Sequence, residues 1–242
     1  MTTVAPPALP APFTWREGQI ALALPGGGAL FTTRLPTAAG STIDLLDGAP
    51  AAATLAAVAG LAPGRVAQSP QVHGAHVRVV AAAADLAGPA PDADGQATDQ
   101  VGVACVVRVA DCLPVVLIAP EAVAAVHAGW RGLAAGVLQE GVRALRALGA
   151  TDVRAAIGPG ARVCCYETGD EVHASFAHLG AAARQGTHAD LAAVARAILE
   201  ADDVTEIHDT GLCTICAPDG LLWSHRRQGE GAGRQGGVAW RS

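Results

Sequence analysis

The spacing of hydrophobic and polar residues predicts a chain in which short buried strands mix with helices. Runs rich in valine, isoleucine and leucine that stop at glycine, proline or polar residues indicate strands. We expect strands at Gln19–Leu24, Ala29–Thr33, Gln71–Ala83, Val101–Val109, Leu113–Ile118, Val123–Val126, Val153–Ile157, Val204–His208, Leu221–Ser224 and Val238–Trp240. We expect helices at Ala49–Leu61, Leu133–Leu148, Asp170–Leu179 and Asp190–Glu200. The segment Pro89–Gln100 is polar and rich in turn residues, which is typical of a loop.

Strands and helices follow one another without a regular strand–helix–strand alternation. This order predicts an α+β fold, a single domain with mixed β-sheets flanked by helices. We place that domain at residues 19–242, because no internal repeat, low-complexity block or linker interrupts it. Residues 1–18 begin with a segment rich in proline and alanine, and we expect them to form a flexible lead-in.

The N-terminal segment and the apolar runs argue against export and against membrane insertion. Met1–Pro12 has no positively charged region, so we do not expect a signal peptide. No run of about 18 apolar residues is free of breakers, which argues against a transmembrane helix. We therefore expect a cytoplasmic protein with no membrane partner, either a monomer or a small homo-oligomer.

Composition limits the classes of function. The chain has 242 residues, of which 51% are hydrophobic and only 3% aromatic, so alanine, valine and leucine should fill the core. The net charge is −6 and no basic block is present, which gives little support to a nucleic-acid partner. Six cysteines in a chain with a large core and no export signal are expected to be reduced thiols.

Three polar side chains stand where apolar strands begin or end, namely His73, Cys112 and His127. Strand ends can converge at one sheet edge, and histidine and cysteine are suitable zinc ligands. Three protein ligands leave a fourth position for water or substrate, which is the catalytic pattern. Their separations match no short zinc motif, so spacing by itself favours the alternative of two buried histidines and an inert thiol.

The turn after His127 also offers an anion site. Arg131 lies between two glycines where a helix is expected to begin, and a helix N-terminus favours negative charge. Further candidates for binding phosphate are Arg34, Arg226, Arg227 and Arg234, because the planar guanidinium matches phosphate oxygens. For any one of these arginines, a solvated or salt-bridged position is the commoner case.

The remaining candidates could also have purely structural roles. Asp111 could orient a ligand at Cys112, or it could cap a turn. Cys213 and Cys216 form a CxxC pair with no second pair, so we interpret them as small hydrophobic residues near a turn. Cys164 and Cys165 are adjacent and should point apart, which would allow only one of them to face a site.

Several segments together carry a family resemblance. They are Gln71-Val-His-Gly-Ala-His-Val77, Ala110-Asp-Cys-Leu-Pro114, Val126-His-Ala-Gly-Trp-Arg-Gly132, Ile157-Gly-Pro159, Cys165-Tyr-Glu167, Asp190-Leu191, Cys213-Thr214, Ser224-His-Arg-Arg227 and Gly233-Arg234. In this order they resemble the YfiH-type laccase-domain proteins, which are described as purine nucleoside phosphorylases and were formerly called multicopper polyphenol oxidases. The resemblance covers roughly residues 31–234.

The resemblance implies a catalytic zinc ion held by His73, Cys112 and His127. It implies phosphorolysis of adenosine, inosine, guanosine and methylthioadenosine, and also hydrolytic deamination of adenosine. Purine nucleosides and phosphate are then the small-molecule partners. We expect Arg34, Gln71, Arg131 and Arg227 to bind the nucleoside or the phosphate.

The sequence departs from the family pattern in two places. The loop at residues 35–40 lacks the usual Gly-Gly-Val-Ser stretch, and His225 replaces a tyrosine. Because both departures lie in expected substrate-lining segments, they bear on how the nucleoside is held.

Three other functions remain as alternatives. A cysteine hydrolase or amidase that edits peptidoglycan precursors would use Cys112 as nucleophile and His127 as base. A non-catalytic zinc or nucleotide-binding module would use the same trio. A copper oxidase has least support, because the eight histidines include no His-x-His pair and the only methionine is Met1.

Overall fold

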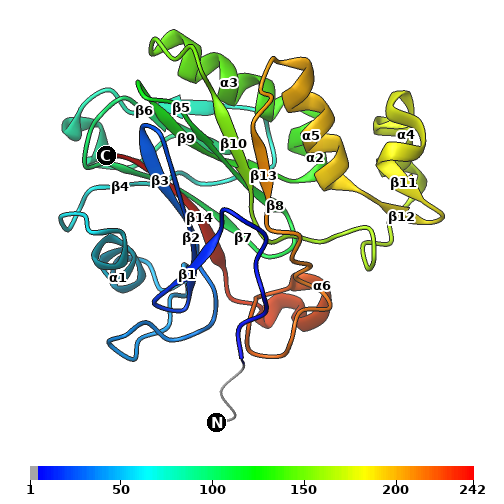
Figure 1. Cartoon of the computed structure of the whole chain (residues 1–242), viewed down its shortest axis with the longest axis horizontal. Coiled ribbons are helices and arrows are strands. Elements are labelled where there is room, and N and C mark those ends of the chain that lie inside the picture. The colour runs from blue at the N-terminus through cyan, green and yellow to red at the C-terminus, as the bar shows by residue number, and fades with distance from the viewer. Residues whose placement is uncertain (1–4) are drawn as a thin grey trace.

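Two six-stranded sheets form the centre of the computed structural model, which describes residues 5–242 (Figure 1). In spatial order the first sheet contains β1 (Thr14–Arg16), β2 (Gln19–Leu24), β3 (Gly27–Phe31), β14 (Gln235–Arg241), β7 (Ala104–Val109) and β4 (Val66–Ala67). The second contains β13 (Ile207–Asp209), β10 (Arg154–Ile157), β8 (Leu113–Ile118), β9 (Val123–Ala128), β6 (Gly95–Thr98) and β5 (Val77–Val79). A separate two-stranded sheet joins β11 (Arg184–Gln185) and β12 (His188–Ala189).

Both large sheets mix strand directions. Most neighbouring strands are antiparallel, whereas β4 and β7, β10 and β13, and β5 and β6 are parallel pairs. The chain therefore crosses between edges and centres of the sheets without a repeating strand–helix unit. This arrangement confirms the predicted α+β class with mixed sheets.

The two sheets pack face to face around one core cluster. Alternate side chains of β8 show how the layers divide, because successive residues of a strand point to opposite faces. Val116 and Ile118 lie in the cluster between the sheets, with Ile20 and Phe31 of the first sheet. Leu117 instead packs under the helices on the outer face of the second sheet. Burial on both faces explains why β8 is apolar throughout.

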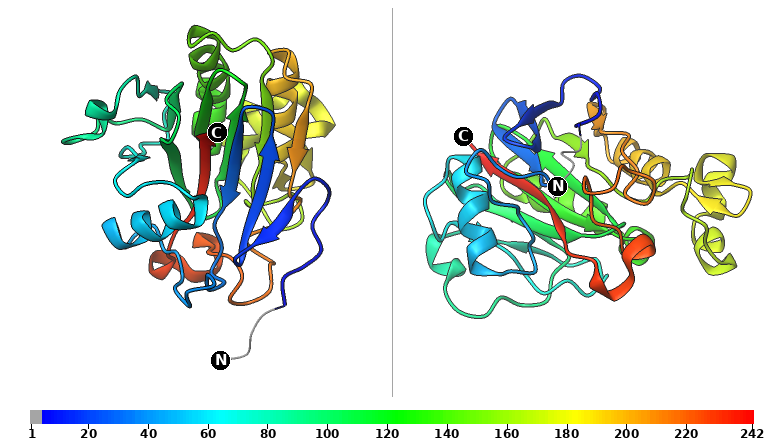
Figure 2. Two further views of the ribbon diagram at one scale, coloured as in Figure 1. Left: turned by 60° about the vertical axis from the view of Figure 1, so that its left-hand side comes forward. Right: turned by 90° about the horizontal axis from the view of Figure 1, so that it is seen from below.

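Helices cover the outer faces of the sheets and complete four layers (Figures 1 and 2). The helix α1 (Ala49–Ala59) packs Leu55 and Val58 on the first sheet. The second sheet is covered by α2 (Trp130–Ala135), α3 (Val137–Ala147) and α5 (Leu191–Ala201). The short elements α4 (Asp170–Ser175), α6 (His225–Gln228) and the 3₁₀ turns Ala83–Leu86, Ala177–Ala183 and Gly229–Gly231 complete the list. Across residues 5–242, every helix is too short or too polar to cross a membrane.

Several predicted elements are wrong at their limits. The helix expected at Leu133–Leu148 divides into α2 and α3, because Gly136 adopts a left-handed φ of 92° between them. Of the strand expected at Gln71–Ala83 only β5 forms, since the residues before it make a turn. The polar segment Pro89–Gln100 contains a buried strand, β6, and Leu221–Ser224 is not a strand.

The folded domain begins earlier in the chain than the predicted boundary at residue 19. β1 pairs antiparallel with β2, and Phe13 is buried in the core between the sheets. These residues belong to the folded domain, so the expectation of a flexible segment at residues 1–18 is wrong for them. Residues 1–4 lie outside the part of the chain that the structure describes.

Candidate active site

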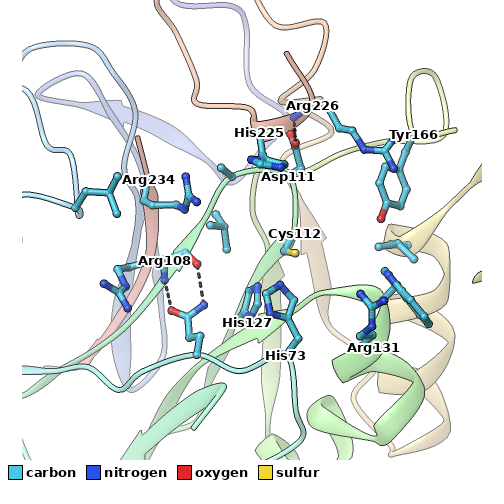
Figure 3. A pocket seen from close by; sticks show the side chains of 16 residues that line it. His73, Arg108, Asp111, Cys112, His127, Arg131, Tyr166, His225, Arg226 and Arg234 are labelled. Atoms are coloured by element: carbon cyan, nitrogen blue, oxygen red, sulfur yellow. Dashed lines mark hydrogen bonds between the residues drawn. The ribbon is translucent and has the colours of Figure 1, made fainter. Parts of the chain in front are cut away.

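Two neighbouring strands and one turn bring the predicted trio together. Pro114 of β8 pairs with His127 of β9, and Cys112 immediately precedes β8, so both side chains lie at the same end of the second sheet. His73 reaches them from the turn before β5. One ligand atom from each residue lies within 4.8 Å of the others, as Figure 3 shows. The juxtaposition expected from the strand ends is therefore present.

A buried carboxylate, Asp94, fixes the orientation of two members of the trio. His127 Nδ1 lies 2.7 Å from Asp94 Oδ1, and the backbone N–H of His73 donates to the same oxygen at 2.9 Å. The N–H groups of Val72 and Gly74 donate to Oδ2. Because Nδ1 of His127 is directed at the carboxylate, Nε2 points toward the other two members of the trio, and it can ligate a metal once it gives up its proton. The same bonds hold His73 at a left-handed φ of 60°.

The ionisation of the trio follows from these contacts. Burial by itself raises the pKa of Cys112, but hydrogen bonds from His127 and His73 outweigh it and lower the pKa to about 6. Burial lowers the pKa of His127, whereas Asp94 and Cys112 raise it, to a net value of about 9. The pKa of Asp94 is lowered, because its bonds to His127 and Gly74 outweigh burial. The site therefore favours a thiolate at neutral pH.

Glycines in the two sequence motifs make room for the trio. A Cβ atom on Gly129 would lie 3.0 Å from Cys112 Sγ and 3.3 Å from His73 Cδ2. A Cβ atom on Gly132 would lie 3.0 Å from the Gly74 carbonyl oxygen. Because a larger residue at either position would push the turn of His73 away, the close approach of the two motifs depends on these glycines.

The trio opens into a cavity of about 540 Å³. The lining residues are Leu46, Gln71, His73, Arg108, Val109, Ala110, Asp111, Cys112, His127, Trp130, Arg131, Tyr166, Leu191, His225, Arg226 and Arg234. Four of them are arginines and one is a carboxylate, so the cavity concentrates positive charge in a chain whose net charge is −6. The altered loop at residues 35–40 does not line the cavity, whereas His225 does.

The four arginines differ in how much of their hydrogen-bonding capacity is free. The guanidinium of Arg108 makes no hydrogen bond or ion pair with any part of residues 5–242, and burial and the charge of Arg234 lower its pKa. Arg234 donates to the carbonyls of Ala232 and Gly233. Arg226 donates to the Glu167 carbonyl and lies over Tyr166. Figure 3 shows Arg108 and Arg234 on one side of the trio, opposite Arg131 and Tyr166.

Gln71 and Arg131 line the cavity in roles that differ from those expected. The amide of Gln71 exchanges two hydrogen bonds of 2.8 Å with the backbone of Arg108, so it positions that strand. The guanidinium of Arg131 stacks on Trp130 and lies 4.0 Å from Glu171, and the side chain is 60% exposed. Because α2 has only six residues, its N-terminus offers a weak dipole to an anion.

The structure does not bring Arg34 and Arg227 into the cavity. Arg34 stacks on the Trp223 ring, and Arg227 donates to the carbonyls of Ala217 and Leu222. Arg227 also pairs with Asp219 at 3.4 Å. Neither residue lines the cavity, and the contacts of their guanidiniums lie within the C-terminal loops, so binding of phosphate by Arg34 and Arg227 stays a prediction.

Asp111 serves the turn rather than a ligand. Its carboxylate accepts hydrogen bonds from the Thr214 hydroxyl at 2.6 Å and from the Arg226 N–H at 2.7 Å. Its φ of 92° is left-handed. Asp111 thus fastens α6 and the segment of Thr214 to the strand end that carries Cys112, which answers the alternative left open by the sequence.

A second cluster contradicts the interpretation of the other cysteines. The thiols of Cys164, Cys165, Cys213 and Cys216 have all four Sγ atoms within 4.8 Å of one another. The thiols of Cys164 and Cys165 both point to the other two cysteines because a tight turn holds them, with the N–H groups of Cys165 and Tyr166 donating to the Arg162 carbonyl. Adjacent side chains diverge in a strand but can converge in such a turn.

Three residues of the site, two of which line the cavity, have no role in the sequence prediction. Asp94 lies in a segment interpreted as a loop, and nothing in its spacing links it to His127. Arg108 is a charged residue inside an otherwise apolar strand, which was a usable signal. Tyr166 belongs to a sequence motif that gives no role for its side chain, and its place in the cavity wall follows from the turn that also carries Cys165.

Comparison with known proteins places the fold and the motifs in one group. A family model described as "Multi-copper polyphenol oxidoreductase laccase" matches residues 49–242. The "Purine nucleoside phosphorylase SCO2081" of Streptomyces coelicolor is 38% identical over 191 residues, 75% of this chain and 77% of that protein. A "Purine nucleoside phosphorylase" of Deinococcus radiodurans is 37% identical over 77% of this chain and 74% of its own.

Solved structures agree with this placement. The Neisseria meningitidis protein NMB0706 superposes with a TM-score of 0.77 at 31% identity, covering 93% of this chain and 99% of its own. YlmD from Geobacillus stearothermophilus superposes with a TM-score of 0.82 at 27% identity, covering 94% and 97%. The chain described here therefore belongs to the multi-copper polyphenol oxidoreductase laccase family.

Proposed function

We propose that this protein is a zinc-dependent purine nucleoside phosphorylase that accepts adenosine, inosine, guanosine and methylthioadenosine. One observation carries the proposal: a histidine–cysteine–histidine trio opens into a cavity that holds four arginines and two aromatic side chains. Relatives that bear the name purine nucleoside phosphorylase support it. The cavity volume of about 540 Å³ suits a small-molecule substrate.

The donor set of the trio fits zinc. Two imidazoles and one thiolate are typical ligands of a catalytic zinc site, and the carboxylate of Asp94 behind His127 is the usual partner of a ligating histidine. When bound, zinc would supply a Lewis acid at the floor of the cavity. His73, Cys112 and His127 would hold it and leave the cavity side open to substrate.

Arg108 and Arg234 are the best-placed phosphate ligands. The two positive charges repel each other, as the lowered pKa of Arg108 indicates, and no carboxylate pairs with the Arg108 guanidinium within residues 5–242. A phosphate ion between them would relieve that repulsion through charge-assisted hydrogen bonds. The proposed phosphate site thus moves from Arg131 to the opposite side of the trio.

Aromatic residues on the other side suit the purine. Trp130 and Tyr166 line the cavity there, and rings of this kind stack on bases. Burial and the nearby Cys112 raise the pKa of Tyr166, so its hydroxyl keeps a proton that it can donate to a purine nitrogen. A phosphate oxygen attacks C1′ of the ribose, the bond from C1′ to the base breaks, and its electron pair leaves with the purine.

The test is turnover of nucleosides by zinc-loaded protein with and without phosphate. Release of adenine or hypoxanthine that requires phosphate, together with ribose 1-phosphate, would support the proposal. Conversion of adenosine to inosine without phosphate would identify the deaminase activity that the family resemblance implies. If zinc-loaded protein turned over no nucleoside, the proposal would be refuted, and a non-catalytic zinc or nucleotide-binding module would take its place.

A second candidate is a cysteine amidase that edits peptidoglycan precursors. The lowered pKa of Cys112, beside two histidines, is what a cysteine nucleophile requires. Iodoacetamide separates the two functions, because a thiolate that ligates zinc is protected from alkylation. If alkylation of Cys112 were equally fast with and without zinc, and amide substrates were hydrolysed, the amidase would be favoured.

A further inference from the structure

Four thiols meet outside the cavity that the proposed reaction uses. Cys164, Cys165, Cys213 and Cys216 contribute nothing to the cavity lining, and their Sγ atoms all lie within 4.8 Å of one another. Cys164 Sγ and Cys216 Sγ are 3.8 Å apart. All four are free thiols in the structure. We call this group the thiol cluster.

Two connecting loops deliver the pairs to the same place. Cys164 and Cys165 follow β10, and Cys213 and Cys216 follow the parallel neighbour β13. The loops are themselves joined, because Gly160 N–H donates to the Leu212 carbonyl and the Thr214 N–H donates to the Gly160 carbonyl. The convergence of the four thiols is thus built into the edge of the second sheet.

Backbone donors point at one sulfur of the cluster. The N–H groups of Arg162, Ile215 and Cys216 donate hydrogen bonds to Cys213 Sγ. N–H groups that converge on a sulfur stabilise a thiolate, as they do around metal-bound cysteines. The loop between Cys213 and Cys216 is closed by the Ala217 N–H, which donates to the Cys213 carbonyl.

We propose that the thiol cluster binds one structural zinc ion through four cysteine thiolates. Four sulfurs in a tetrahedral arrangement are diagnostic of zinc or iron. A Zn–S distance of about 2.3 Å places tetrahedral sulfurs about 3.8 Å apart, so Cys164 and Cys216 already have that separation. An iron–sulfur cluster would hold the cysteines further apart, because several irons and sulfides lie between them.

Such an ion would tie two segments of the cavity wall together. Tyr166, which lines the cavity, directly follows Cys165, and Thr214, which bonds to Asp111, directly follows Cys213. With four protein ligands the site has no open position, so its role is to hold the fold. This inference does not depend on the proposed phosphorylase activity, because it concerns different residues and a different readout.

Metal content tests the proposal directly. The full-length protein, refolded or expressed with zinc, should contain two zinc ions per chain by mass spectrometry of the metal. The double variant His73→Ala, His127→Ala should keep one, and adding Cys213→Ser and Cys216→Ser should remove it. The control Cys105→Ala changes a buried cysteine outside both clusters and should keep both ions.

Cobalt gives a second readout that needs no cysteine variant. The His73→Ala, His127→Ala protein loaded with Co²⁺ should show strong thiolate-to-cobalt charge-transfer absorption and the visible bands of a tetrahedral site. A single zinc ion that His127→Ala removes completely would overturn the proposal. A disulfide between Cys164 and Cys216 in freshly purified protein, or iron in place of zinc, would overturn it as well.

Discussion

The trio and the thiol cluster use similar ligand atoms in opposite settings. His73, Cys112 and His127 face a positively charged cavity, and a buried carboxylate orients them. The thiol cluster faces no cavity, and backbone N–H groups approach one of its sulfurs. The surroundings of each site therefore indicate the role of its metal. An open coordination position beside arginines suits catalysis, whereas four thiolates at a loop junction suit a stabilising role.

The supporting elements differ in the same sense. Cys112 and His127 lie at β8 and β9, the two central strands of the second sheet, whose side chains are fully buried. His73 joins them from the turn before β5. The thiol cluster joins loops after β10 and the edge strand β13. A rigid sheet fixes catalytic ligands precisely enough for chemistry, while loops at an edge gain most from a cross-link. We therefore expect loss of the trio to abolish activity and loss of the cluster to reduce stability.

The largest effect on activity should come from His127→Ala. Removing this ligand leaves Cys112 and His73 unable to hold zinc firmly, and nucleoside turnover should fall by more than about 100-fold, since a bound metal contributes several kcal/mol to transition-state stabilisation. The zinc at the thiol cluster should remain, and so should most of the thermal stability. Assays of turnover, zinc content and unfolding on the same preparation check all three. Retained activity would remove the trio from the mechanism.

The complementary change, Cys213→Ser with Cys216→Ser, should act on stability. If free zinc is about a thousandfold above the dissociation constant, loss of the site costs about 4 kcal/mol, which corresponds to roughly 10 °C in Tm for a chain of this length. Thermal unfolding in the presence of zinc measures the shift. The buried variant Cys105→Ala is the control for loss of a thiol alone. An equal shift in both variants would mean that no metal holds the cluster.

Asp94→Asn separates orientation from ligation, because Asp94 touches the trio without being part of it. An asparagine cannot hold the His127 tautomer as firmly, so zinc affinity at the trio should fall about 10- to 100-fold. Chelator competition measures this, with Asp92→Asn, an exposed neighbour, as control. The thiol cluster should be unaffected. Unchanged zinc affinity would show that Asp94 only braces the turn of His73.

The same variant has a pH signature in metal-free protein. The pKa of Asp94 is lowered from its ordinary value of 3.8, because bonds from His127 and Gly74 outweigh burial. A carboxylate with a lowered pKa stabilises the fold above its unfolded pKa, and that stability is lost as pH falls through the folded pKa. The free energy of unfolding, measured with urea, should therefore decline less steeply for the variant than for wild type as the pH is lowered from 5.

The sequence predicted the trio better than the cluster for a physical reason. Each member of the trio interrupts or follows an apolar run, and the ends of neighbouring strands meet at one edge of a sheet. A position at a strand end therefore predicts which side chains lie close together in the fold. The cysteines of the thiol cluster stand in loops, where hydrogen-bonded turns decide which way a side chain points. Cys164 and Cys165 illustrate this, because a tight turn reverses the divergence expected of a strand.

The arginines show the same limit. Arg34 and Arg227 were expected to bind phosphate because of their chemistry, yet backbone carbonyls and the Trp223 ring occupy them. Arg108 lay unnoticed within a predicted strand. The hydrophobic pattern predicted the mixed sheets. It did not predict the short strand β6, because that strand lies in a polar segment rich in turn residues. Contacts with residues distant in the sequence decide both the role of each arginine and the formation of β6, and no local sequence pattern reports such contacts.

The effect confined to a single kinetic constant should come from Arg108→Ala, which tests whether the positive charge beside the trio has a function that the thiol cluster lacks. Loss of a charge-assisted contact to phosphate costs about 2 kcal/mol, so KM for phosphate should rise ~30-fold while both zinc ions remain bound. Arg34→Ala tests the position predicted from sequence and should leave KM for phosphate unchanged. Steady-state kinetics at varied phosphate and saturating inosine distinguish the two. If Arg34→Ala raised KM and Arg108→Ala did not, phosphate would bind outside the cavity, and the contrast between a trio beside an anion site and a purely structural cluster would fail.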